Sequence, residues 1–326
     1  MSQITTSNSL MPQILTTLDK NIGKYYLNNQ YDNALKSITK TIKKKPNNSD
    51  NYYERASINF VLENYDVALI DINTAIRLTP SKYIYYLAKA QIEITIKGLD
   101  TALKTIDEAI DLDSSILMAY ILKSRFYFDL GNYDTAIKEY QNAIEINNRF
   151  NPNLNKSEMK NSHFFMGLSY LAKNDLSNAL TEINKSLIDT FRHKTMLIYR
   201  AKVYYLSDQL DQANIDFQKV TKISIDTLQK AIAYAYLGDK EMAIQTVNSF
   251  KRINQVNLTK QYHVDAAAVY CILKEYDIAL DYLDKIKHFK QNYTEWILNN
   301  PDFKNLKNND RFLAIISKMK INHNEH

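Results

Sequence analysis

The chain has 326 residues, of which 45% are hydrophobic and 24% are charged, proportions that are usual for a folded soluble protein. It contains only five Gly and five Pro, which is few for a sheet-rich protein and favours helices joined by short connections. The single cysteine, Cys271, excludes an intrachain disulfide framework and predicts a reducing, cytoplasmic compartment. No stretch approaches the roughly 20 apolar residues of a membrane helix, so no membrane span is expected.

The N-terminal residues 1–12 are polar, and we expect them to be mobile. After them one phrase recurs: QYDNALKSITKTIKK at 30–44, NYDVALIDINTAIRL at 64–78 and NYDTAIKEYQNAIEI at 132–146. Alignment on its alanine gives eight copies: Ala34, Ala68, Ala102, Ala136, Ala179, Ala213, Ala243 and Ala279. The first three steps between these alanines are each 34 residues, and such a fixed period indicates a solenoid of repeated units.

Each copy predicts two helices. The alanine and the apolar residue four positions later lie on one face of the second helix. An acid or hydroxyl two positions before the alanine, such as Asp66, suits the start of that helix, where it can accept a backbone N–H. Twelve positions before the alanine, seven of eight residues are small, which lets the first helix approach the second closely. A tyrosine often follows three residues later and fills the space beside the small residue.

These features, together with Pro46 and Pro80 twelve residues after the first two alanines, resemble the tetratricopeptide repeat family over roughly residues 15–290. The resemblance implies an all-α, right-handed superhelical solenoid of antiparallel helix pairs whose first helices line the concave side. We expect repeats 1–4 over residues 13–146 and repeats 5–8 over residues 160–290.

Two segments interrupt this pattern. The polar stretch 147–159 is predicted to be an inserted loop, either a hinge between two blocks of four repeats or an extended connection within one solenoid. Residues 291–320 are predicted to cap the apolar end of the stack, with Phe312, Leu313 and Ile316 forming the inner face of a last helix. Residues 321–326 are expected to form a mobile tail.

The sequence offers no set of catalytic residues. No Gly-rich phosphate loop is present, the six histidines are scattered, and the carboxylates at fixed repeat positions are explained by helix starts. We therefore predict a protein that is not an enzyme and that has no cofactor, metal or catalytic site.

The predicted working surface is the concave groove, because stacked helix pairs generally use it to bind extended peptides or partner helices. By the family resemblance, these residues belong on the groove side: Tyr26, Tyr53, Phe60, Leu87, Ile94, Ile121, Arg125, Phe128, Phe164, Ile198, Lys202 and Tyr205. Neighbouring first helices could instead bury these rows against one another. If the rows are exposed, Arg125 and Lys202 could steer a ligand carboxylate.

The function expected from the sequence is a non-enzymatic scaffold or adaptor that binds a peptide or partner helix in the groove. The partner is an unidentified protein or peptide. The positions that hold a C-terminal carboxylate in chaperone-binding members of the family carry Asp19, Gly23, Glu54, Ile84 and Ala88, so no chaperone carboxylate clamp is expected. The weaker alternative is a nucleic-acid-associated repeat protein, which the net charge of +5 and the scattered lysines would allow.

Overall fold

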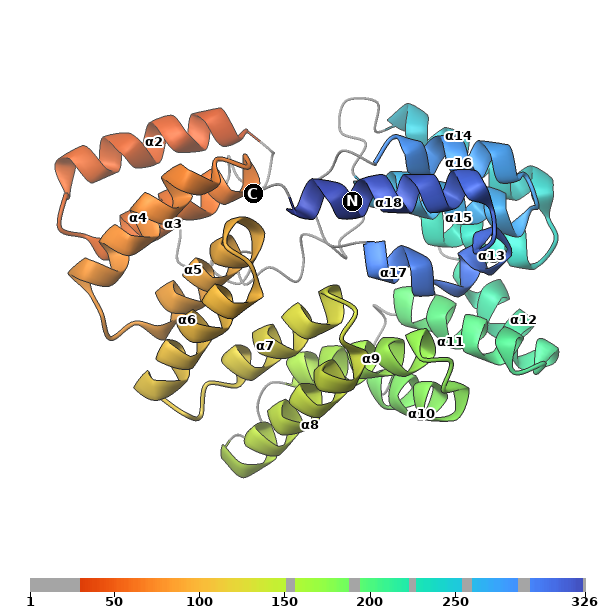
Figure 1. Ribbon diagram of the computed structural model, residues 1–326, viewed down its shortest axis with the longest axis horizontal. Helices are drawn as coiled ribbons and strands as arrows, with labels where there is room; N and C mark the ends of the chain where they lie inside the picture. The colour runs from red at the N-terminus through yellow and green to blue at the C-terminus, as the bar shows by residue number, and fades with distance from the viewer. Residues whose placement is uncertain are drawn as a thin grey trace. The chain divides into compact units, whose positions relative to one another are not determined.

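The computed structural model describes residues 30–150, 156–187, 194–222, 227–253, 260–286 and 294–324, and within these ranges the regular elements are helices. In chain order (Figure 1) they are α2 (Tyr31–Lys44), α3 (Ser49–Val61), α4 (Tyr65–Leu78), α5 (Tyr83–Ile96), α6 (Leu99–Leu112), α7 (Leu117–Asp129), α8 (Tyr133–Phe150), α9 (Lys156–Ala172), α10 (Leu176–Ser186), α11 (Lys194–Leu206), α12 (Leu210–Thr221), α13 (Leu228–Tyr236), α14 (Lys240–Ile253), α15 (Lys260–Ile272), α16 (Tyr276–Asp284), α17 (Thr294–Asn299), the 3₁₀ helix η2 (Pro301–Leu306) and α18 (Asp310–Asn324). Helices that are neighbours in the chain pack as pairs: α3 with α4, α5 with α6, α9 with α10, α11 with α12, α13 with α14 and α15 with α16. The predicted all-α solenoid of helix pairs is therefore confirmed.

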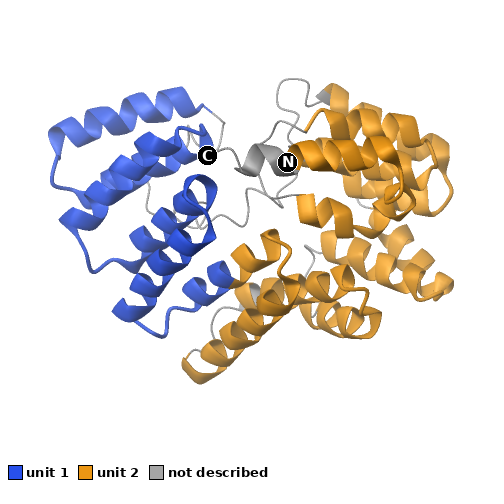
Figure 2. Ribbon diagram, viewed as in Figure 1, with its two compact units in different colours: residues 1, 3–123 blue, residues 2, 124–326 orange. Residues whose placement is uncertain are grey.

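The chain divides into two compact units, which are coloured separately in Figure 2. Unit 1 comprises the described residues up to Lys123, and unit 2 begins at Ser124, so the division falls inside α7 rather than in segment 147–159. Within the predicted inserted segment 147–159, α8 continues to Phe150 and α9 begins at Lys156. Residues 151–155 and the N-terminal residues 1–12 lie outside the described ranges.

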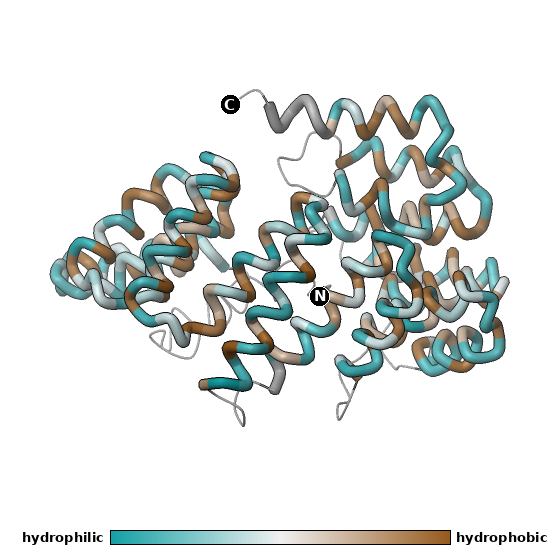
Figure 3. The backbone as a smooth tube through the Cα atoms, turned by 60° about the horizontal axis from the view of Figure 1, so that its bottom comes forward, coloured by the Kyte–Doolittle hydropathy of each residue, from teal (hydrophilic) through white to brown (hydrophobic). Residues whose placement is uncertain are grey.

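Close approach of the two helices in each pair is achieved at small side chains. The eight repeat alanines are fully buried: Ala34, Ala68, Ala102, Ala136, Ala179, Ala213, Ala243 and Ala279. So are the residues four positions later: Ile38, Ile72, Ile106, Tyr140, Ile183, Phe217, Val247 and Leu283. A Cβ added to Gly167 of α9 would lie 2.7 Å from Cγ1 of Ile183, which confirms that the small residue faces the second helix. In Figure 3 hydrophobic and hydrophilic residues alternate along the helices, as one buried face per helix requires.

Six of the turns between paired helices in the described ranges share one backbone conformation. Five positions before the alanine the backbone adopts a positive φ at Glu63, Gly131, Asn174, Asp208, Gly238 and Lys274. The N–H of the next residue donates to the carbonyl five residues back, as in Glu275 N to Tyr270 O at 2.8 Å, while Lys274 N donates to Cys271 O at 3.1 Å. These two bonds define a Schellman motif, which satisfies carbonyls that the helix end would leave free.

The side-chain caps of the second helices differ from the sequence prediction. Each of these helices begins three residues before the alanine, so the N-cap is the residue before that, four positions from the alanine. Asp175 and Asp239 accept backbone N–H groups of Asn178 and Met242 there, at 3.2 and 3.1 Å. The predicted acid two positions before the alanine lies inside the first helical turn. Its negative charge there interacts favourably with the positive end of the helix dipole.

The C-terminal residues form α17, η2 and α18. Helix α18 packs against α16 and buries Phe312, Ile315 and Ile316, whereas Leu313, which we expected on this inner face, is 46% exposed. The helix reaches Asn324 and so extends into the segment that we expected to be a mobile tail. Phe303 and Leu306 of η2 are buried in the same core as α11 to α16.

The shared turn generates a pair of opposite stability predictions. Lys274→Gly should raise the free energy of unfolding by up to about 1 kcal/mol, because it removes the clash of a Cβ at positive φ and loses only part of that gain to chain entropy. Gly238→Ala should lower it by about 1 kcal/mol, since its Cβ would meet no atom within 4 Å and only the backbone is strained. Urea unfolding followed by circular dichroism measures both variants, and changes of the same sign would contradict this account of the turn.

Candidate functional site

The residues predicted for the groove differ in how far they are covered. Tyr26 lies outside the described residues. In unit 1, Tyr53 and Leu87 are buried, while Phe60, Ile94 and Ile121 are half-buried. In unit 2 the predicted groove residues range from fully buried to exposed. Phe128, Phe164, Ile198 and Lys202 are buried, Arg125 is half-buried and Tyr205 is exposed.

The first-helix side of unit 2 is covered by the chain's own C-terminal segment. The ring of Trp296 in α17 lies 5.6 Å from the ring of Phe128 in α7 and 5.9 Å from that of Tyr199 in α11, measured between centroids. Next in the chain, η2 packs against α15. Helices α7, α11 and α15 are all first helices of their pairs. Residues 294–306, which we call the groove segment, therefore lie on the side that the repeat pattern assigns to the groove (Figure 1).

A buried ion pair fastens the groove segment at Lys202. The ammonium nitrogen of Lys202 lies 2.6 Å from Oδ2 of Asp302, and the two side chains are only 2% and 1% exposed. The phenol of Tyr236, at the end of α13, donates to Oδ1 of the same carboxylate at 2.7 Å. The Lys202 ammonium also lies 4.7 Å from the centre of the Tyr199 ring, a cation–π distance. One carboxylate thus accepts from two first helices, and both members of the ion pair are buried.

Local structure holds Asp302 in this position. Asn300 caps η2 by accepting the backbone N–H of Asp302 at 3.1 Å, and Pro301 occupies the first helical position, where its missing N–H costs nothing. Phe303, directly after Asp302, is fully buried. At the other end of the segment, Glu295 approaches Gly131, where an added Cβ would lie 2.7 Å from the Glu295 Cβ.

Burial dominates the electrostatics around Asp302. It raises the pKa of Tyr236 well above its ordinary value, and the Asp302 carboxylate adds to this shift. Burial, with a smaller contribution from Asp302, also raises the pKa of the Cys271 thiol to about 12, so this cysteine is not a reactive thiolate at neutral pH. These phenol and thiol groups therefore remain neutral and act as packing and hydrogen-bonding groups.

Asp265 of α15 is a second carboxyl in this region. Burial raises its pKa from 3.8 to about 7; a hydrogen bond from Gln261 and the charge of Lys202 oppose the shift, and the charge of Asp302 adds to it. Gln261 donates to Oδ1 at 2.7 Å, while Oδ2 has no hydrogen-bond partner. Asp265 therefore keeps its proton to a higher pH than an ordinary aspartate does.

The second predicted groove cation, Arg125, also has partners within the chain. Its Nε donates to Asp129 one helical turn later at 2.7 Å, and its guanidinium lies 4.4 Å from the centre of the Phe165 ring. The structure does not bring Arg125 and Lys202 onto one shared carboxylate. Sequence reasoning identified Lys202 but missed Tyr236 and Asp265, and it assigned Asp302 to the cap only.

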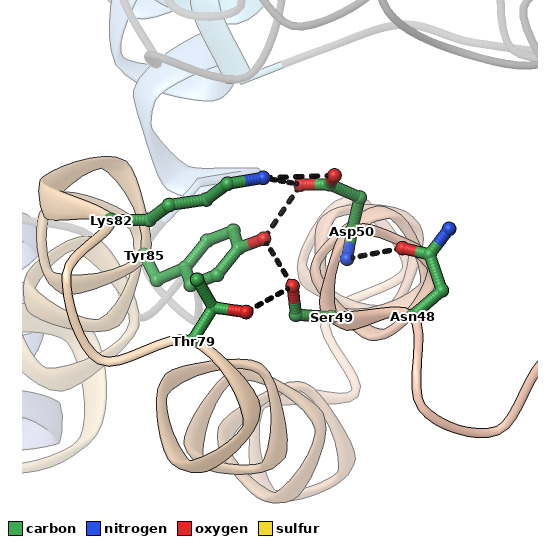
Figure 4. A network of polar contacts seen from close by, with 6 residues as sticks. All are labelled: Asn48, Ser49, Asp50, Thr79, Lys82 and Tyr85. Carbon is green, nitrogen blue, oxygen red and sulfur yellow. Dashed lines mark hydrogen bonds and ion pairs between the residues drawn. The ribbon is translucent and has the colours of Figure 1, made fainter.

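In unit 1 a polar network joins the starts of two neighbouring first helices (Figure 4). Lys82 donates to both oxygens of Asp50 at 2.8 and 2.9 Å, and Tyr85 donates to the same carboxylate at 2.6 Å. The oxygen of Tyr85 also lies 2.9 Å from Oγ of Ser49. Burial opposes the ionisation of Asp50, but the hydrogen bonds from Lys82 and Tyr85 outweigh it and hold the pKa of Asp50 below its usual value. The network fixes α5 relative to α3.

Among the residues that the structure describes, no group of three or more His, Cys, Asp and Glu side chains is arranged to hold a metal ion. No helix in the described ranges is both long and apolar enough to cross a membrane.

Comparisons with known proteins agree with this architecture. Two tetratricopeptide repeat family models match residues 24–83 and 119–150. The solved structure of pilF from Pseudomonas aeruginosa aligns with a TM-score of 0.50 and 16% identity, covering 66% of this chain and 94% of that one. PilW, a type IV pilus biogenesis factor, aligns with a TM-score of 0.49 and 15% identity over 64% of this chain and 94% of its own. The structure of a human IFIT1 dimer with m7Gppp-AAAA aligns with a TM-score of 0.49 and 16% identity, covering 78% of this chain and 67% of that one. A search of curated proteins found no match.

At these identities, the likeness to pilF shows a shared helical-repeat fold and nothing about the ligand.

The Lys202–Asp302 pair generates a mutational prediction. Lys202→Met should lower the free energy of unfolding by about 3–5 kcal/mol, because it leaves the Asp302 charge buried without its partner. The double variant Lys202→Met/Asp302→Asn should lose much less of its free energy of unfolding than Lys202→Met does, because no charge is then left buried alone. The matched control is Arg311→Met: Arg311 and Asp281 also lie 2.6 Å apart, but their side chains are 46% and 62% exposed. That change should cost less than about 1 kcal/mol in urea unfolding. Equal losses for Lys202→Met and Arg311→Met would contradict the assignment.

Asp265 generates a prediction about pH. Between about pH 4 and pH 7 the folded chain keeps a proton on Asp265 that the unfolded chain has released, so the free energy of unfolding should fall as pH rises through this range. The shift of about three units sets an upper limit of about 4 kcal/mol. Asp265→Asn should flatten this part of the stability–pH curve and stabilise the protein at pH 8. Urea unfolding at pH 4.5, 6 and 8 measures the slope, and an unchanged slope in the variant would reject the assignment.

Proposed function

Since this chain is a tetratricopeptide-repeat protein, we propose that it is a non-enzymatic scaffold that binds a protein partner along the concave, first-helix faces of its repeats. The tetratricopeptide fold is in general that of protein–protein interaction scaffolds, because stacked helix pairs offer a long surface to an extended partner. The finer part of the proposal is that the partner contributes a peptide or a helix and that the first helices receive it.

One observation carries the proposal. The groove segment of unit 2 is itself a stretch of polypeptide seated on the first helices, through Trp296 on α7 and α11 and through Asp302 on α11 and α13. The face therefore has the shape and the polar groups needed to receive a short segment of chain.

Unit 1 offers a comparable row of apolar side chains. Phe60 and Ile94, on α3 and α5, occupy the corresponding position in successive repeats and are only half-buried. We propose that they contribute to the partner surface of unit 1. The fixed placement of α5 against α3 by Lys82, Asp50 and Tyr85 makes this row preorganised, which lowers the entropic cost of binding.

We propose no catalytic role, and we place the protein in the cytoplasm. The pKa of Tyr236 is strongly displaced, but this half-buried residue is hydrogen-bonded within the chain to Asp302, where it supports packing rather than chemistry.

The proposal is tested with matched lysine substitutions. Ile94→Lys alters the concave side of unit 1, whereas Ile70→Lys places the same charge on α4 at a side chain that is 66% exposed. Protein partners captured by crosslinking from cells that contain the protein should fall at least tenfold for Ile94→Lys and stay unchanged for Ile70→Lys. Quantitative mass spectrometry measures the capture, and circular dichroism checks that both variants are folded.

Capture that is unchanged by Ile94→Lys would reject the concave face as the partner surface. Recovery of nucleic acid in place of protein, with binding that falls steeply as salt is raised, would favour the alternative function.

A further inference from the structure

The two parts of the C-terminal region lie on different surfaces of unit 2. Helix α18 packs against the last second helix, α16, and covers the end of the stack with Phe312 and Ile316. Such a helix is sufficient as an end cap. The groove segment instead contacts first helices that belong to earlier repeats, as far back as Phe128 of α7. Capping the end of a stack does not require contacts so far from that end, so the groove segment calls for a separate explanation.

The groove segment is held in the manner of a bound peptide, by one aromatic anchor and one acidic anchor. Trp296 rests on the rings of Phe128 and Tyr199, and six positions later Asp302 accepts from Lys202 and Tyr236. The Tyr199 ring is common to both anchors, since it also lies under the Lys202 ammonium. An aromatic side chain and a paired charge in a water-excluded pocket are typical of residues that dominate binding energies.

The face beneath this segment requires an acid from whatever covers it. Lys202 is only 2% exposed at its side chain, and an ammonium group buried without a partner is strongly unfavourable. Asp265 contributes a nearby charge only when it is deprotonated, and the donor to its Oδ1 is Gln261 rather than Lys202. An occupant of this face must therefore bring its own carboxylate to Lys202 and Tyr236.

We propose that the first-helix face of unit 2 is a binding site for short segments that carry an aromatic residue followed six positions later by an acid, and that residues 294–306 are its built-in occupant. A partner segment of the same chemistry displaces the groove segment and takes over the contacts of Trp296 and Asp302. This inference rests on the proposed function and names the kind of partner that unit 2 accepts.

The test uses the full-length chain and a fluorescent synthetic peptide of residues 294–306. In the wild-type protein the groove segment competes with the peptide, so binding should be weak. Asp302→Lys places a second ammonium group against Lys202 and should release the segment, so the peptide should bind at least tenfold more tightly than to wild type. Peptides carrying Asp302→Asn or Trp296→Ala should bind this variant at least tenfold more weakly than the unchanged peptide.

Two further proteins serve as controls. Asp281→Lys breaks the exposed pair with Arg311 and leaves the groove segment in place, so it should bind the peptide as weakly as wild type does. The exchanged pair Lys202→Asp/Asp302→Lys restores the attraction with the charges reversed. It should close the face again and return peptide binding to the wild-type level, which separates an electrostatic effect from unfolding.

Hydrogen exchange provides the second measurement. In Asp302→Lys, amides of residues 294–306 should exchange at least tenfold faster while those of α11, α13 and α15 keep their protection. If those helices lose protection together with the segment, or if the peptide fails to bind the released face, the segment is a fixed part of the fold and the proposal is overturned. Loss of partners in Ile94→Lys would then still support the scaffold function, because that variant tests unit 1 alone.

Discussion

The close approach of paired helices at small side chains is the constraint on which the whole architecture depends. The repeat alanines are fully buried, and Gly167 lies so near Ile183 that no Cβ fits between them. Because the helix axes are this close, the residue four positions after each alanine is also enclosed, and the large side chains of the first helices are directed to the opposite side. The first-helix face, with its aromatic rings and its buried lysine, is therefore a consequence of the packing on the second-helix side.

Those parts of the fold that depend on local period could be predicted from the sequence. The alanine row and the apolar row after it repeat in every copy, so their burial followed directly. The bidentate contacts of Arg55 with Asp71 and of Arg200 with Asp216 were missed, although each joins positions sixteen residues apart. Only two repeats carry this combination, so it has no period. Comparing just those two repeats, with an arginine and an aspartate at equal offsets, would have found it.

The candidate site was only half predictable for a related reason. The groove position of Lys202 followed from the family pattern, because it belongs to a repeat. Its partner Asp302 lies 100 residues later, in a segment outside the repeat register, and no spacing rule connects the two. Whether a groove is open or filled depends on such contacts between a repeat and a non-repeat segment. The sequence was compatible with either state. In unit 2 the Lys202–Asp302 ion pair shows that the first-helix face is filled by the chain's own groove segment.

The same ion pair limits how this array can evolve. Helical hairpins whose turns are closed by their own backbone bonds can be duplicated or deleted as whole modules, since each copy carries its own closure and its own pair of small residues. Between Lys202 and Asp302 this freedom is lost. An additional hairpin inserted there would move the aspartate away from the lysine and leave both charges buried alone. The contact therefore fixes the number of modules between Lys202 and Asp302, whereas modules elsewhere in the array can still be gained or lost.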